Sequence, residues 1–219
     1  MMPPTDPSIP NLPEEVSLAK ALAAIAPGGV YAGCRLIREG DEAHLLPQEA
    51  RSIPARQPAL RRASGAARWI AHRLLADIGI GGVAIPRAPS GAPVWPEGII
   101  GSLAHDDDMA VAAIARIADI GALGIDVEPA LPLPDDIFAL VANGPDRMET
   151  ADQPLAGRIL FAAKEAVYKA VYPLDRQILG YEDIAVDLDN GRATTSTGRK
   201  VSLAYCIAPR VVALAFVRQ

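Results

Sequence analysis

Two stretches decide how this chain folds: LFAAKEAVYKAV at residues 160–171, and GIDVEP at residues 124–129. At about 100° per residue, the first winds into a helix whose apolar side chains share one arc. That arc holds Leu160, Ala163, Ala166, Val167, Ala170 and Val171. The charged side chains of Lys164, Glu165 and Lys169 follow on the adjacent flank. The second stretch has the pattern of a buried strand with two carboxylates, so we predict a site where helix and strand meet.

Length and composition predict a globular protein with a substantial core. The chain has 219 residues, of which 50% are hydrophobic, enough for one domain or for two small halves packed together. Its net charge of −5 argues against general binding to nucleic acid or anionic membranes, because no global positive field is present. Arginines without neighbouring acids nevertheless form a local positive zone at residues 51–75. No apolar run approaches the eighteen or so residues of a membrane span.

The cysteines and the first residues indicate a reducing cytoplasm. Cys34 and Cys206 each lie in an apolar, strand-like run without CxxC spacing, so both are expected to be buried thiols. Residues 1–13 are rich in proline and have neither a basic region nor an apolar segment. We therefore expect a mobile leader rather than a secretory signal.

Hydrophobic periodicity and turn residues predict two halves joined near the middle of the chain. Helices are expected at residues 14–26, 59–78, 135–142 and 155–171. Strands are expected at residues 30–37, 43–46, 83–85, 98–104, 109–117, 123–127, 184–188, 201–208 and 211–217. The link at residues 119–122 separates a predicted N-terminal half, 14–118, from a C-terminal half, 119–219.

Asp126 and Glu128 are the first candidates for chemistry. Two positions apart on a strand, their side chains leave the same face roughly 6 to 7 Å apart. Carboxylates this close repel each other unless a cation lies between them, and Mg²⁺ prefers such oxygens while keeping sites for substrate phosphates. Glu165 supplies a third oxygen if its helix crosses the end of the strand. The alternatives are a solvated strand end and a surface ion pair between Glu165 and Lys169.

Other side chains suit a substrate with several phosphates. His105 ends a strand at a turn, where it is either incidental or a phosphate contact. The arginines of residues 61–73 are either a solvated helix face or bidentate forks for phosphate. The sequence has no P-loop, no GxGxxG after a strand, no HExxH and no GxSxG. The pattern favours Mg²⁺-assisted phosphoryl-type transfer on a nucleotide-like substrate.

Three motifs occur in order: GSLAH at residues 101–105, GIDVE at 124–128 and FAAKEAVYK at 161–169. PVWP precedes them at residues 93–96, and RR with ARWIA lies earlier, at residues 61–62 and 67–71. In this order and spacing the set resembles the 4′-phosphopantetheinyl transferases, most closely the enterobactin synthase component D type. The resemblance covers roughly residues 51–190, and it is the set rather than any single motif that is specific.

The resemblance implies an α/β (α+β) fold of two similar halves related by a pseudo-twofold, each a small antiparallel-rich sheet packed on a long helix. It implies a monomeric holo-[carrier protein] synthase with its active site between the halves. The enzyme would move the phosphopantetheine arm of coenzyme A to a serine of an acyl, peptidyl or aryl carrier protein and release 3′,5′-ADP. Such enzymes serve siderophore, fatty acid or polyketide biosynthesis. Mg²⁺ is the implied cofactor, with Mn²⁺ as a substitute.

The resemblance also implies a role for each residue. The metal ligands would be Asp126, Glu128 and Glu165, and Glu165 would also take the serine proton. The coenzyme A contacts would be Arg61, Arg68, Ser102, His105, Lys164 and Lys169, with Lys164, Lys169 and His105 also stabilising the leaving group.

Four positions depart from the family pattern: Ala104 replaces a hydroxyl residue, Asp106 follows the histidine, Ala67 replaces a glycine, and Ala92 replaces a basic residue for which Arg87 would substitute. None of these departures removes a metal ligand. Two rival functions keep the same cleft: a non-catalytic protein that binds coenzyme A or a carrier, and a Mg²⁺-dependent hydrolase of coenzyme A.

Overall fold

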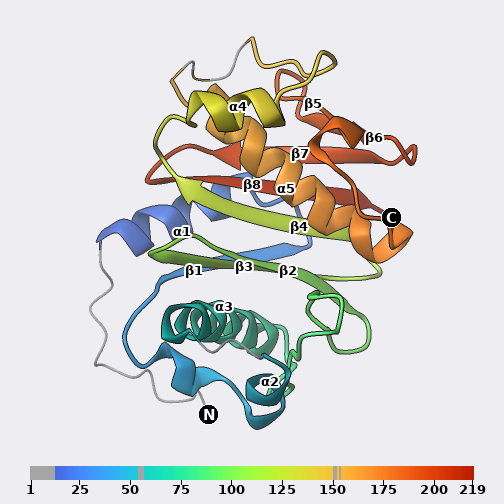
Figure 1. The fold of residues 1–219 in the computed structure, drawn as a ribbon. Coiled ribbons are helices and arrows are strands. Elements are labelled where there is room, and N and C mark those ends of the chain that lie inside the picture. Colours follow the sequence, from blue (N-terminus) through green and yellow to red (C-terminus); the bar gives the residue numbers. More distant parts are fainter. Residues whose placement is uncertain (1–12, 54–56, 150–151, 153) are drawn as a thin grey trace.

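The structure is a computed structural model that describes residues 13–53, 57–149, 152 and 154–219. Two antiparallel sheets lie at its centre, and helices cover their outer faces (Figure 1). The leader predicted at residues 1–13 falls outside the described residues except for Pro13, where the first helix begins. In the part of the chain that is described, no helix has the length and apolar character needed to cross a membrane.

The N-terminal half is built on a three-stranded sheet in the order β1-β3-β2. Its elements are α1 (Pro13–Ile25), β1 (Val30–Leu36), η1 (Asp41–His44), α2 (Pro47–Ser52), α3 (Pro58–Asp77), β2 (Ile99–His105) and β3 (Met109–Arg116). The predicted hairpin is confirmed, since β2 and β3 pair antiparallel over their whole length. Helix α3 lies along the outer face of this sheet (Figure 1).

The C-terminal half is built on a five-stranded sheet in the order β4-β8-β7-β6-β5. Its elements are β4 (Ile120–Pro129), α4 (Asp135–Val141), α5 (Ala156–Asp175), η2 (Tyr181–Asp183), β5 (Ile184–Asp187), β6 (Arg192–Thr195), β7 (Lys200–Cys206) and β8 (Arg210–Arg218). Helix α5 crosses the outer face of this sheet, so both halves repeat one plan (Figure 1). This α+β architecture agrees with the predicted fold class.

The inner faces of the two sheets share one core. Along β4, Leu123, Ile125 and Val127 point into that core, where they meet Met109 and Val111 of β3. The alternate residues of each strand face outward to the covering helix, as strand geometry requires. Asp126 and Glu128 therefore face α5 rather than the other half.

Helix α5 packs unusually close to β4 at Gly124. The apolar arc predicted for this helix is buried, including Leu160, Ala163, Ala166 and Val167. A Cβ atom at Gly124 would stand only 1.9 Å from the carbonyl oxygen of Ala166. Only glycine allows this approach, and the approach brings the flank of α5 to the carboxylates of β4.

Two short predicted strands are wrong. Residues 43–46 continue from η1, because the carboxylate of Asp41 accepts bonds from Arg35 and from the backbone N–H of Arg38 and so closes a local turn. Residues 83–85 are irregular, because the N–H of Ile85 donates to the buried carboxylate of Glu49 at 2.7 Å instead of to a strand partner. Helix α2 and strand β6 were not predicted.

Candidate active site

Asp126 is a buried carboxylate with one free oxygen. The residue is only 6% exposed overall, and its Oδ1 accepts a bond of 2.6 Å from Lys169 Nζ. Among the described residues, Oδ2 is buried without a hydrogen-bond partner. Burial raises the pKa of Asp126 to about 6 against the opposing charge of Lys169, and the charges of Glu128 and Glu165 raise it further. Burial, more than the neighbouring charges, therefore disfavours the ionised form of Asp126.

Glu128 is held by an arginine that sequence reasoning missed. Arg158 Nη1 lies 2.6 Å from Glu128 Oε2, and its other nitrogens donate to the carbonyls of Leu131 and Pro132. Burial raises the pKa of Glu128 against the opposing bond from Arg158, and the charge of Asp106 adds to the rise. A local signal existed, because Arg158 precedes Glu165 by seven residues, two turns along one helix face.

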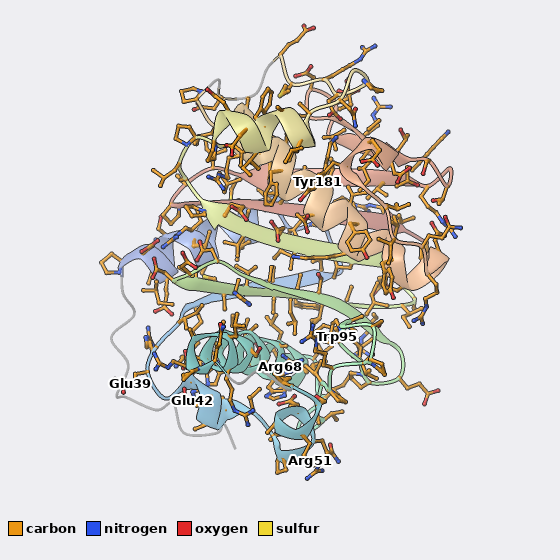
Figure 2. All side chains as sticks on the ribbon, in the orientation of Figure 1. Glu39, Glu42, Arg51, Arg68, Trp95 and Tyr181 are labelled. Carbon is orange, nitrogen blue, oxygen red and sulfur yellow. The ribbon has the colours of Figure 1, made fainter. Side chains whose placement is uncertain are left out.

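Glu165 accepts a hydrogen bond from a tyrosine hydroxyl. Tyr181 Oη lies 3.0 Å from Glu165 Oε1, and the Tyr181 ring packs at a tilt against Phe161. Figure 2 shows Tyr181 beside α5 in the C-terminal half. Burial raises the pKa of Tyr181, and the charge of Glu165 raises it further, so the hydroxyl keeps its proton and donates. No periodic signal in the sequence marked Tyr181, since it reaches Glu165 from the three-residue helix η2.

The three carboxylates have different partners in this structure: Lys169, Arg158 and Tyr181. Across the described residues, no group of three or more His, Cys, Asp or Glu side chains is arranged to hold a metal ion. The metal ligand set therefore stays a prediction.

Lys164 is bonded within the protein in this structure, and its contact with phosphate stays a prediction. Its side chain is fully buried, and Nζ lies 2.8 Å from Asp146 Oδ2. The same ammonium donates to the carbonyls of Val141 and Tyr181 at 2.8 and 3.0 Å. Burial lowers the pKa of Lys164, while the bond to Asp146 opposes that shift. With its donors used on loops beside α5, Lys164 supports the site from within the core.

The predicted substrate contacts His105 and Ser102 both lie on β2 of the N-terminal half. His105 is exposed at the end of β2, with Nδ1 at 3.2 Å from the carbonyl oxygen of Asp106. Ser102 is buried on β2 opposite Ala113, on the strand face that meets the C-terminal half. Their contacts with a substrate stay predictions.

The two predicted phosphate arginines lie on α3 with different exposure. Arg68 is 5% exposed, and its Nε donates to the carbonyl of Ile85 at 2.8 Å (Figure 2). Burial lowers the pKa of Arg68, against the nearby charge of Glu49. Arg61 is half-buried, and its Nη1 reaches the carbonyls of Ala50 and Ile53 at 3.5 and 3.4 Å. Within the described residues neither guanidinium forms a salt bridge, and the contact of both with phosphate stays a prediction.

Trp95 explains the glycine of the histidine motif. A Cβ atom at Gly101 would lie 2.6 Å from Trp95 Cζ2, so the indole packs flat against the backbone of β2 (Figure 2 labels Trp95). Arg87 stands in the same loop, where it forms a β-bridge with Pro93 and its Nε donates to the carbonyl of Gly91. The PVWP stretch thus braces the strand that ends at His105.

Comparison with known proteins identifies both halves. Residues 42–115 match the 4′-phosphopantetheinyl transferase N-terminal domain, and residues 122–215 match the 4′-phosphopantetheinyl transferase superfamily. The chain is 36% identical over 182 residues to 4′-phosphopantetheinyl transferase Npt of Nocardia iowensis, covering 81% of this chain and 82% of the relative. It is 39% identical over 166 residues to PptT of Mycobacterium tuberculosis, covering 72% and 70%.

A third relative, 4′-phosphopantetheinyl transferase Svp of Streptomyces mobaraensis, is 36% identical over 163 residues, covering 68% of this chain and 64% of the relative. The matches to both family models and to these relatives lead to one conclusion. The chain belongs to the 4′-phosphopantetheinyl transferase family.

Proposed function

We propose that this chain transfers the phosphopantetheine arm of coenzyme A to a serine of an apo carrier protein and releases 3′,5′-ADP, using a divalent cation beside Asp126. As a member of its family it is a transferase with coenzyme A as substrate. The cation site is proposed because Oδ2 of Asp126 is buried without a hydrogen-bond partner among the described residues, close enough to Glu128 and Glu165 for their charges to interact. We propose Mg²⁺, with Mn²⁺ as a substitute.

The donor set suits such a cation. Carboxylate oxygens are the ligands that Mg²⁺ prefers, and a few of them suffice because the remaining positions go to water and phosphate. Asp126, Glu128 and Glu165 would hold the ion, which when bound would neutralise charge on the pyrophosphate of coenzyme A. Lys169 and Arg158 now balance two of these carboxylates, so their ion pairs would loosen as the ion enters.

Glu165 would accept the serine proton. Its Oε1 accepts a hydrogen bond from the hydroxyl of Tyr181, and Oε2 would be the acceptor. The serine oxygen would form a bond to the phosphorus of the phosphopantetheine group as the bond from that phosphorus to 3′,5′-ADP breaks. The proton passes to Glu165, and Lys169 with His105 would stabilise the charge on the departing ADP.

The N-terminal half would hold the rest of coenzyme A. Arg61 and Arg68 keep their positive charge unpaired by carboxylates in the described residues, which suits the 3′-phosphate. Ser102 and His105 would contact the substrate from β2. The N-terminal half is assigned residues 14–118, and the C-terminal half residues 119–219.

The test is transfer to carrier proteins, followed by intact-mass spectrometry. Purified chain is incubated with coenzyme A, Mg²⁺ and a panel of apo acyl, peptidyl and aryl carriers. We expect at least one carrier to gain the arm, and expect EDTA to stop the reaction and Mg²⁺ or Mn²⁺ to restore it. Failure with every carrier, at saturating coenzyme A, would overturn the enzyme function.

The same samples separate the rival functions. A non-catalytic binding protein would show thermal stabilisation by coenzyme A without any modified carrier. A hydrolase would release 3′,5′-ADP in the absence of a carrier. The proposal also includes the enterobactin synthase component D type, a monomeric state and a cytoplasmic location. Carrier preference is measured for the type, and light scattering is measured for the oligomeric state.

A further inference from the structure

Arg210 of the C-terminal half is surrounded by acids from the N-terminal half. Its Nη1 donates to Asp106 Oδ2 at 2.8 Å, and its Nε donates to Glu14 Oε1 at 2.8 Å. Nη2 lies 3.7 Å from Asp108 Oδ2. Arg210 and Asp106 have side chains only 13% and 5% exposed, so water and salt screen their interaction less than that of a surface pair.

Asp106 connects this arginine to the predicted phosphate contact. While its Oδ2 binds Arg210, its Oδ1 accepts bonds from the backbone N–H groups of Asp108 and Met109 at 2.8 and 2.7 Å. The carbonyl oxygen of the same residue lies 3.2 Å from His105 Nδ1. Asp106 therefore fixes the turn after β2 and orients the imidazole of His105. Through its ion pair with Arg210 it also links both to the C-terminal half.

The other end of the Asp106–Arg210 ion pair lies beside β4, the strand that carries Asp126 and Glu128. Arg210 is the first residue of β8 and stands opposite Pro129 of β4, one position beyond Glu128. Asp106 is near enough to Glu128 for their charges to interact. The ion pair thus spans the junction between the turn with His105 and the strand with Asp126 and Glu128.

We propose that Asp106 and Arg210 are positioning residues that set His105 relative to the carboxylates across the cleft. The guanidinium suits this role because two of its nitrogens bond separate carboxylates, which fixes its plane. The inference also accounts for the acidic residue after the histidine, where the family pattern has a small one. It rests on the proposed function, since His105 must contact coenzyme A for its position to matter.

The test compares variants of Arg210, its partners and His105 by calorimetric titration with coenzyme A and Mg²⁺ in the absence of a carrier, together with transfer kinetics. Asp106→Asn keeps an oxygen for the turn but removes the ion pair, and Arg210→Gln removes it from the other side. We expect each to weaken coenzyme A binding and raise its KM by about three- to tenfold, with a smaller change in kcat. Arg210→Lys should recover part of the loss.

Glu14→Gln is the matched control, because it removes another partner of Arg210 and leaves the histidine turn tied. We expect coenzyme A affinity within about twofold of wild type for this variant. The decisive measurement combines Asp106→Asn with His105→Ala. If Asp106 acts through His105, the double variant binds coenzyme A no more weakly than His105→Ala alone, because the two effects are not additive.

The outcomes separate the inference from the function on which it rests. If His105→Ala weakens binding but the Asp106 and Arg210 variants do not, the inference is wrong and the transferase function stands. If those variants only lower Tm, or weaken binding additively with His105→Ala, the ion pair merely joins the halves and positioning is refuted. If His105→Ala binds coenzyme A normally, positioning is also refuted, while transfer by the wild-type chain still decides the function.

Discussion

Each half of the molecule is arranged around one fully buried charged side chain, but the signs are opposite. Glu49 in the N-terminal half accepts bonds from His72 and from the backbone N–H groups of Ile85 and Leu46. Lys164 in the C-terminal half donates to Asp146 and to two carbonyls. In both cases loops are fixed to a twenty-residue helix, α3 or α5.

The residues proposed to bind the substrate differ in charge between the halves as well. In the N-terminal half they are the arginines of α3 and the histidine of β2, whereas in the C-terminal half they include the carboxylates of Asp126, Glu128 and Glu165. Under the proposed function, cations would face phosphate on one side and carboxylates would face a metal on the other. The buried charge of each half, in contrast, is bonded within the protein and fixes the surrounding segments.

The largest expected effect is on the carboxylate side. Glu165→Gln should lower kcat by about 10² to 10⁴, because the amide cannot accept the serine proton. The rate is measured by intact mass of a modified carrier. Glu97→Gln, an exposed acid of the N-terminal half, is the control and should keep a normal rate. A near-normal rate for Glu165→Gln would assign the base elsewhere.

Lys164→Met tests whether the buried cation is a support. Removal of the ammonium leaves the carboxylate of Asp146 buried without its charged partner, which should lower the free energy of unfolding by about 3 to 5 kcal/mol. Urea denaturation measures the loss, and Asp146→Asn in the same chain should restore part of it. Lys20→Met, at an exposed lysine of α1, is the control.

The same variant also tests the original sequence prediction. If Lys164 supports the fold only, the fraction that folds should keep a normal KM for coenzyme A. A raised KM in correctly folded protein would instead show that Lys164 reaches phosphate in the working enzyme.

Close glycine contacts occur in both halves and predict a smaller loss. A Cβ atom at Gly124 would lie 1.9 Å from the Ala166 carbonyl, and one at Gly65 would lie 2.0 Å from the Asp41 carbonyl. Alanine at either position should lower the free energy of unfolding by about 1 to 3 kcal/mol, since helix and backbone must separate. Gly121→Ala meets only the end of the Gln219 side chain, at 3.3 Å, and should be nearly neutral in urea denaturation.

The two glycine variants should differ in activity. Gly124→Ala moves the helix that carries Glu165, so it should lower kcat beyond its effect on stability. Gly65→Ala displaces only α3 and should act mainly on coenzyme A binding. Equal decreases in kcat for Gly124→Ala and Gly65→Ala would contradict the proposed division of roles, in which the C-terminal half carries the catalytic base and the N-terminal half binds coenzyme A.

The smallest expected effect is the pH dependence of the stability that the buried carboxylate of Glu49 provides to the N-terminal half. Burial alone would raise the pKa of Glu49, but bonds from His72, Ile85 and Leu46 outweigh it and hold the pKa below its ordinary value of 4.5. A carboxyl with a lowered pKa stabilises the fold above its unfolded pKa, and that contribution is lost as pH falls. We expect about 1 to 2 kcal/mol at neutral pH between wild type and Glu49→Gln.

The measurement is urea denaturation of both proteins at several pH values. The difference in unfolding free energy should be constant from neutral pH down to about 5 and should shrink as pH falls further below 4.5. A difference that grows on acidification would contradict the sign of the Glu49 shift.

Local patterns predicted the fold better than they predicted the partners of the site. The apolar arc of α5 and the alternation around Asp126 are periodic, so the sequence revealed which faces are buried. The bond of Lys164 to Asp146 was not foreseen, because nothing periodic indicates that residues 141–146 cover this flank of α5. Tyr181 was missed for a similar reason, since it contacts Glu165 from the short helix η2, which has no periodic signal.

The core shared by the two sheets predicts how the protein behaves when the chain is cut between them. Each sheet gives one apolar face to the other, while residues 116–119 between them form an exposed turn. A break in that turn would leave two fragments, each with an uncovered hydrophobic sheet that only the other fragment fits. We expect such fragments to be insoluble when made separately and to reassemble into a working enzyme when made together, so that transfer activity reports their association.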